Sequence, residues 1–128
     1  MLKKLYLCLA VLWSAIITFL CLVQLQNVPF KGVSNIDKLV HTFFYFVLTI
    51  LWFLYFSLQL DKDKYSKQLL VSVIFSFFYG VTIEIFQECF TTSRHADLYD
   101  VFANLFGALL AFFFLFCWCK YFKFRIKK

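Results

Sequence analysis

Proline and glycine are scarce in this chain of 128 residues, which has one Pro and three Gly. Flexible and extended linkers between domains are rich in these residues, so we predict a single domain over residues 1–128. The sequence also lacks a glycine-rich phosphate loop, an H-E-x-x-H motif and any closely spaced pair of histidines. These absences argue against a soluble nucleotide-binding protein and against the common zinc hydrolases.

Charged residues make up only 16% of the chain, whereas hydrophobic residues make up 63% and include 20 Phe. Soluble domains are about 45–50% apolar, so the composition indicates an integral membrane protein. Four apolar runs lie at about 5–23, 40–60, 69–90 and 101–119. Each is close to the ~20 residues that a helix needs to cross the hydrocarbon, where the backbone must satisfy its own hydrogen bonds. The predicted fold is therefore all-α, a bundle of four transmembrane helices.

The basic residues are distributed unevenly around these runs. Ten of the 13 Lys and Arg fall at the two termini and between the second and third runs. Cytoplasmic segments carry this excess, so we predict cytoplasmic termini and outward-facing loops at about 24–39 and 91–100. The same rule accounts for the net charge of +6 without a nucleic-acid partner. We expect the first run to be retained as a helix, because no small-residue cleavage site follows it.

Polar and ionisable side chains gather at the predicted outer end of three helices. They are Asp37, Lys38, His41 and Tyr45 before and on the second run, Glu84, Gln87 and Glu88 on the third, and Arg94, Asp97, Asp100 and Asn104 before and on the fourth. Side chains four residues apart share a helix face, and ionisable groups are costly in hydrocarbon. We therefore predict that these side chains face one another in one outward-facing pocket. Below it, Ser76, Gly80 and Gly107 should bring the third and fourth helices close together.

Several of these residues also have a purely structural explanation. Glu84 could be a protonated carboxyl that bonds to Asn104 or Gln87. Asp37 and Asp97 could be helix N-caps, because an aspartate oxygen readily accepts a bond from the first backbone N–H groups. Their coincidence at one membrane face, on three helices, favours a functional site.

Two segments, DKLVHTFFYFVL and GVTIEIFQECFTTSRHADLYDVFANLFGALLA, resemble the VanZ-like family. That family has D-K-x-x-H-x-x-x-Y/F, then E-x-x-Q and R-x₅-D-x₃-N-x₂-G, which match this chain over about residues 36–112. The motif positions are Asp37, Lys38, His41, Tyr45, Glu84, Gln87, Arg94, Asp100, Asn104 and Gly107. The resemblance implies a protein of the bacterial cell membrane. It also implies a link to low-level teicoplanin resistance, which is a phenotype and not a reaction.

The leading hypothesis is binding or modification of a membrane lipid, a lipid-linked cell-wall precursor or a lipoglycopeptide drug at the outer leaflet. Lys38 and Arg94 would hold a phosphate or carboxylate, and His41 and Glu84 would act as acid and base if chemistry occurs. The remaining ligand-binding candidates are Asp37, Tyr45, Gln87, Asp97, Asp100 and Asn104. No cofactor is required and no metal ligand is assigned.

Two other classes stay open. One is a divalent-metal-dependent hydrolase or transferase that uses His41, Glu84, Asp97 and Asp100. The other is a structural or partner-binding membrane module in which the polar groups fix the helix register. The sequence leaves open whether a bond is broken and whether the chain forms a homo-oligomer.

Overall fold

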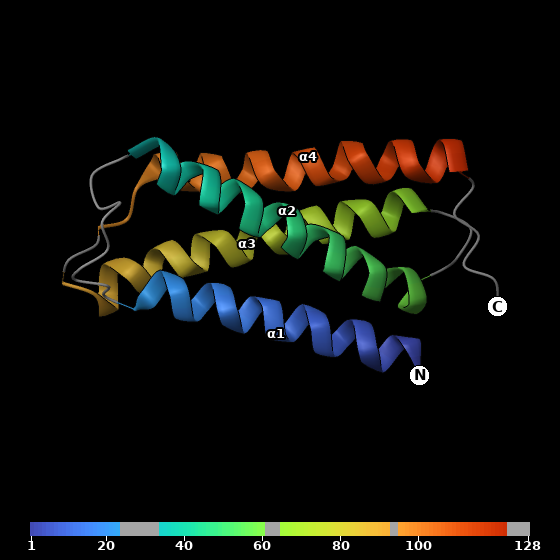
Figure 1. Cartoon of the computed structure of the whole chain (residues 1–128), viewed down its shortest axis with the longest axis horizontal. Helices are drawn as coiled ribbons and strands as arrows, with labels where there is room; N and C mark the ends of the chain where they lie inside the picture. Colours follow the sequence, from blue (N-terminus) through green and yellow to red (C-terminus); the bar gives the residue numbers. More distant parts are fainter. Residues whose placement is uncertain (24–33, 61–64, 93–94, 123–128) are drawn as a thin grey trace.

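The computed structural model describes residues 1–23, 34–60, 65–92 and 95–122. These residues form four helices: α1 (Leu2–Leu22), α2 (Ser34–Gln59), α3 (Tyr65–Phe90) and α4 (Leu98–Phe122), shown in Figure 1. At 1.5 Å per residue, helices of this length span roughly 30–40 Å, against a hydrocarbon core of about 30 Å. All four are long and apolar enough to cross a membrane. The predicted all-α, four-helix architecture is confirmed, and it is that of a multi-pass membrane protein.

The helices extend beyond the apolar runs that predicted them. The second helix begins at Ser34 and not near residue 40, and the fourth begins at Leu98 and not at 101. Hydropathy marks the part of a helix inside hydrocarbon, whereas backbone hydrogen bonding continues into the polar boundary. Asp37 and Asp100 therefore lie on the first turns of α2 and α4.

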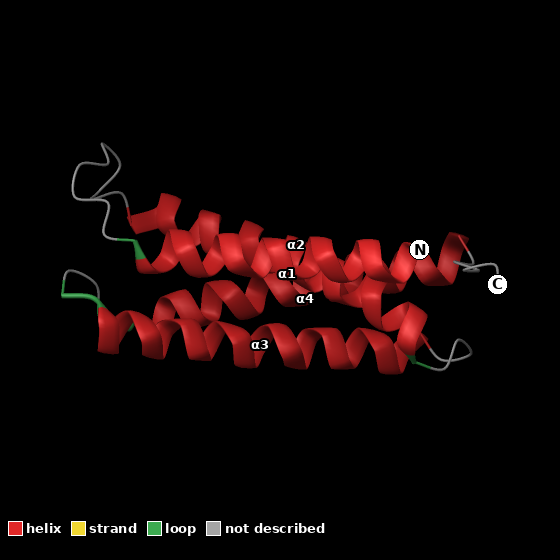
Figure 2. Cartoon of the chain, turned by 90° about the horizontal axis from the view of Figure 1, so that it is seen from below, coloured by secondary structure: helices red, strands yellow, loops and turns green. Residues whose placement is uncertain are grey.

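The four helices alternate in direction, so the polar segments of three of them meet at one end. The start of α2, the end of α3 and the start of α4 lie together at one end of the bundle, and the start of α1 and the end of α4 lie at the other (Figure 1). Seen at right angles, α3 runs along one side of the bundle (Figure 2). Among the described residues, α4 packs most extensively on α2, while α1 contacts α2 and α3.

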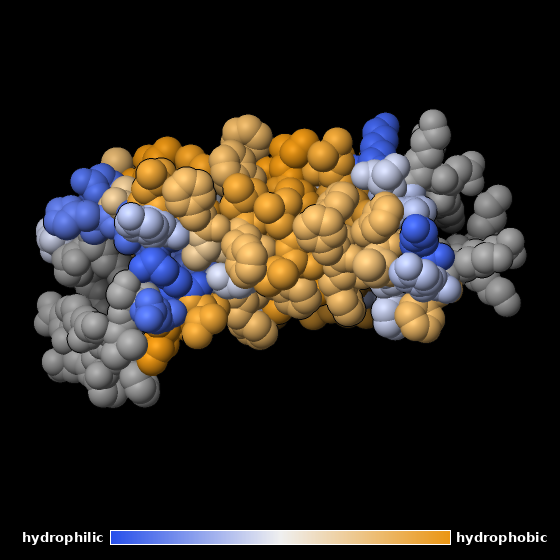
Figure 3. Space-filling model, turned by 90° about the horizontal axis from the view of Figure 1, so that it is seen from above, coloured by the Kyte–Doolittle hydropathy of each residue, from blue (hydrophilic) through white to orange (hydrophobic). Residues whose placement is uncertain are grey.

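Many large apolar side chains point outward, and several small or polar side chains are buried inside the bundle. Ser72 and Ser76 are fully buried, whereas Phe78 and Phe113 are exposed. Figure 3 shows the result, a broad apolar band with hydrophilic groups at both ends. In lipid, where outward phenylalanine carries no penalty, helices associate through small residues and interhelical hydrogen bonds. The distribution is what a lipid-facing bundle requires.

Gly107 allows a close backbone approach between two helices, and its neighbour is α2. A Cβ added there would lie 2.2 Å from the backbone oxygen of Thr42. The Thr42 hydroxyl also donates to the carbonyl of Ala103, at 3.3 Å. The prediction that Gly107 faces the third helix is therefore wrong, since face periodicity does not say which neighbour a face meets.

Gly80 on α3 makes room for side chains from two other helices. A Cβ there would lie 3.0 Å from a ring carbon of Tyr45 and 3.2 Å from the amide nitrogen of Asn104. Gly80 thus lets Tyr45 of α2 and Asn104 of α4 meet beside α3. This position is directly below the polar end, by which we mean the end of the bundle where the start of α2, the end of α3 and the start of α4 lie together (Figure 1).

Candidate functional site

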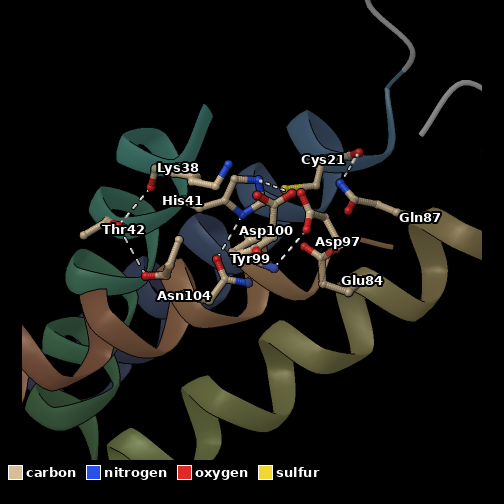
Figure 4. A network of polar contacts seen from close by, with 11 residues as sticks. Cys21, Lys38, His41, Thr42, Glu84, Gln87, Asp97, Tyr99, Asp100 and Asn104 are labelled. Carbon is tan, nitrogen blue, oxygen red and sulfur yellow. Dashed lines mark hydrogen bonds and ion pairs between the residues drawn. The ribbon is translucent and has the colours of Figure 1, made fainter. Parts of the chain in front are cut away.

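His41 stands at the centre of the polar end, on α2. Its side chain is buried, and its Nδ1 lies 2.9 Å from Oδ1 of Asn104 on α4. Because that oxygen is an acceptor, Nδ1 carries the proton and donates it. In the neutral ring, Nε2 then presents a lone pair, and it lies 4.0 Å from Oδ2 of Asp100 (Figure 4). Asn104 thereby fixes both the tautomer and the direction of the imidazole.

Glu84 reaches from α3 towards the start of α4. Its side chain is 3% exposed, and its Oε2 accepts a 3.3 Å bond from the backbone N–H of Asp97. Figure 4 shows the carboxylate turned towards Asp97 and Asp100. The prediction that Glu84 faces the bundle is confirmed. Its bonding partner is the Asp97 backbone, not the side chain of Asn104 or Gln87 that the structural reading would require.

Three buried polar atoms at this end have no hydrogen-bond partner within the described part of the chain. They are the Tyr45 hydroxyl, the Asn104 amide nitrogen and Oε1 of Glu84, one from each of α2, α4 and α3. Native proteins pair nearly all buried polar groups, and a buried one left unpaired costs about 1–3 kcal/mol. Three such atoms around Gly80 and the turn above it offer hydrogen-bonding capacity that water or a ligand can satisfy.

The other carboxylates at the polar end have different surroundings. Asp97 accepts a 2.9 Å bond from the backbone N–H of Tyr99, so the predicted N-cap is confirmed for Asp97. Asp37 is not a cap, because α2 begins three residues before it. Asp100 is half-buried beside His41. Glu88 and His95 form an exposed pair, 3.6 Å apart, in which Glu88 also accepts the Ala96 N–H.

The first turns of α2 and α4 meet through two further features. Asp37, His41 and Asp100 each offer a ligand atom, and these atoms all lie within 4.8 Å of one another. The Lys38 ammonium lies 5.6 Å from the centroid of the Tyr99 ring, which is a cation–π distance. One face of α2 therefore presents an imidazole, a carboxylate and an ammonium to α4.

The structure brings together most of the residues that the sequence singled out. They are Asp37, Lys38, His41, Tyr45, Glu84, Asp97, Asp100 and Asn104. Gln87 is buried, but its amide donates to the Cys21 carbonyl at 2.9 Å and so attaches α1 to α3. Arg94 lies outside the described residues. Thr42 and Tyr99 were missed, and a polar side chain next to His41 was the available signal for Thr42.

Comparison with known proteins gives a family for the chain. No curated protein and no solved structure matches it. A model of the VanZ/LLP1 family matches residues 5–120, which include most of each of the four helices and every residue of the polar end. The chain therefore belongs to the VanZ/LLP1 family.

Proposed function

We propose that this chain is a bacterial cell-membrane protein that contributes to resistance against glycopeptide antibiotics of the teicoplanin type. It would do so by binding or modifying an envelope lipid, a lipid-linked wall precursor or the drug itself at an outward-facing polar site. Membership of the VanZ/LLP1 family supports the phenotype. The convergence of unpaired buried groups from three helices is the observation that carries the site.

The position of the site suits a ligand with an acyl chain and a polar part. The polar end borders directly on the apolar band in Figure 3, so one molecule can contact both. Lys38 and the N-terminus of α4 provide positive charge for a phosphate or carboxylate of the ligand. The distribution of Lys and Arg favours an orientation with this end outside the cytoplasm. If a bond is broken, His41 and Glu84 are the residues placed for proton transfer.

One rival has a specific contact in its favour. The His41–Asn104 bond joins α2 to α4 in the same way as a structural clamp would. A clamp requires only hydrogen bonding and shape, so it tolerates substitutions that keep both. A binding or catalytic site requires the ionisable group itself.

The variant Glu84→Gln distinguishes a binding or catalytic site from a structural clamp. The glutamine oxygen can still accept from the Asp97 N–H, but the ionisable group is lost. We expect the wild-type chain, expressed in a susceptible bacterium, to raise the inhibitory concentration of a teicoplanin-type drug, and Glu84→Gln to lose that gain. The measurement is drug susceptibility at matched membrane levels of the protein.

Glu88→Gln is the matched control, because Glu88 lies one turn away on α3 and is exposed. It should keep the full gain. A Glu84→Gln chain as protective as wild type would favour the structural clamp, and no gain from the wild-type chain would contradict the proposed phenotype.

A further inference from the structure

We propose that Asp37, His41 and Asp100 bind a divalent transition-metal cation at the polar end of the bundle. The inference deepens the proposed function, because it uses the same site. It concerns metal binding alone, however, and is tested without a resistance assay. The sequence suggested His41, Glu84, Asp97 and Asp100 as possible metal ligands, whereas the structure groups Asp37 with His41 and Asp100.

The three ligand atoms lie nearly as close together as one shared ion requires. Ligand atoms at about 2.1 Å from a common ion are at most about 4.2 Å apart. Nε2 of His41 and Oδ2 of Asp100 are 4.0 Å apart, which is too long for a hydrogen bond but inside that limit. The whole trio lies within 4.8 Å, and both carboxylates are more exposed than His41, so a small side-chain rotation closes the set.

The imidazole is already oriented as a metal ligand. Its Nδ1–H donates to the Asn104 oxygen at 2.9 Å. The lone pair of Nε2 therefore faces Asp100 and can coordinate a metal ion. Metal-binding histidines characteristically donate their second ring N–H to a protein oxygen in this way. Asn104 is thus a positioning residue for His41. Asp37 and His41 are four residues apart on α2, which places both on one face.

An independent observation at Glu84 also indicates a cation. The Glu84 side chain is only 3% exposed, and its Oε1 has no partner among the described residues while the carboxylate points at the start of α4 (Figure 4). The side chains of Glu84, Asp97 and Asp100 lie together in that region (Figure 4). Such groups repel one another strongly when they are ionised in a medium of low dielectric constant, and a bound dication would offset that repulsion.

The ligand set limits the identity of the ion. One imidazole and two carboxylates suit Mn²⁺ or Zn²⁺ better than Ca²⁺, which takes oxygen ligands only. A cation here would also let an acidic site accept an anionic ligand, because the ion would lie between the carboxylates and a phosphate or carboxylate of that ligand.

The test is metal titration of the purified, chelator-stripped chain in detergent. Mn²⁺ is followed by the loss of its free-ion electron paramagnetic resonance signal, and Zn²⁺ by calorimetry. We expect one ion per chain for at least one of the two metals. Loss of a ligand in His41→Gln or Asp100→Asn should weaken binding by more than about 100-fold, and Asn104→Ala by about 10–100-fold.

The exposed pair provides the control. The double variant Glu88→Gln, His95→Gln removes a carboxylate and an imidazole 3.6 Å apart at the same end and should bind metal like wild type. Helical circular dichroism without metal shows that each variant is folded, and added metal should raise the unfolding temperature of wild type but not of His41→Gln.

Failure of wild type to bind either ion, or equal affinity in folded His41→Gln and wild type, would overturn the metal site. Resistance that depends on Glu84 would survive that result, so the two proposals fail separately.

Discussion

A chain carrying His41→Ala is expected to give no resistance above that of cells without the protein, although it reaches the membrane in normal amount. Alanine removes the donor to Asn104 and the nitrogen that faces Asp100 in one step. Helices α2 and α4 would keep their apolar contacts, so insertion of the chain into the membrane should be preserved. The measurement is drug susceptibility alongside quantification of the protein in membranes.

Asp100→Asn tests whether His41 acts together with α4. Residues that function as a unit lose most of the activity when any one is removed, and their effects do not add. We therefore expect Asp100→Asn to fall to the same level as His41→Ala, and the double variant to fall no further. Full resistance in Asp100→Asn, next to complete loss in His41→Ala, would show that the two side chains do not share one site.

Gly107→Ala is expected to have the largest effect on stability. The new Cβ would lie 2.2 Å from the Thr42 backbone oxygen, and a backbone atom cannot rotate away. Helices α2 and α4 must then separate along their principal contact. Overpacking usually costs about 1–3 kcal/mol, and we expect a value at or above the top of that range. Thermal unfolding in detergent measures it.

Gly80→Ala provides the comparison within the same bundle. Its Cβ would meet side-chain atoms of Tyr45 and Asn104 at 3.0 and 3.2 Å, and side chains can move by a few tenths of an ångström. The loss of stability should therefore be smaller than for Gly107→Ala. The reverse order, or a neutral Gly107→Ala, would contradict the close α2–α4 approach.

The number and type of helices could be predicted because the membrane restricts the choice of structure. An apolar run of sufficient length must be helical where no water is available to the backbone. The ends of the helices could not be predicted in this way. Residues 34–39 continue α2 through a mostly polar stretch, where hydropathy gives little signal and backbone hydrogen bonding decides where the helix begins.

Face periodicity predicted which end of the bundle most of the candidate side chains share, but it did not predict their contacts. Spacing placed His41 and Asn104 at one end of the bundle, and the structure makes them a hydrogen-bonded pair. Spacing could not show that Gly107 meets α2, or that Gln87 bonds to α1, because several helix orders satisfy the same pattern. Which helices are neighbours depends on packing across the whole bundle.

The side of the membrane on which the polar end lies decides whether the site can meet outer-leaflet lipid or drug. Position 95 is suited to show this, because the His95 side chain is 83% exposed at that end and no role in the site is proposed for it. His95→Cys, in a chain whose five native cysteines are replaced, can be treated with a membrane-impermeant maleimide on intact cells. Lys3→Cys, at the opposite end of the bundle, is the control.

We predict that the maleimide labels the His95→Cys chain in intact cells and labels the Lys3→Cys chain only after permeabilisation. The opposite pattern would contradict an outward-facing site: a Lys3→Cys chain labelled in intact cells, with the His95→Cys chain protected until the membrane is opened, would place the polar end in the cytoplasm.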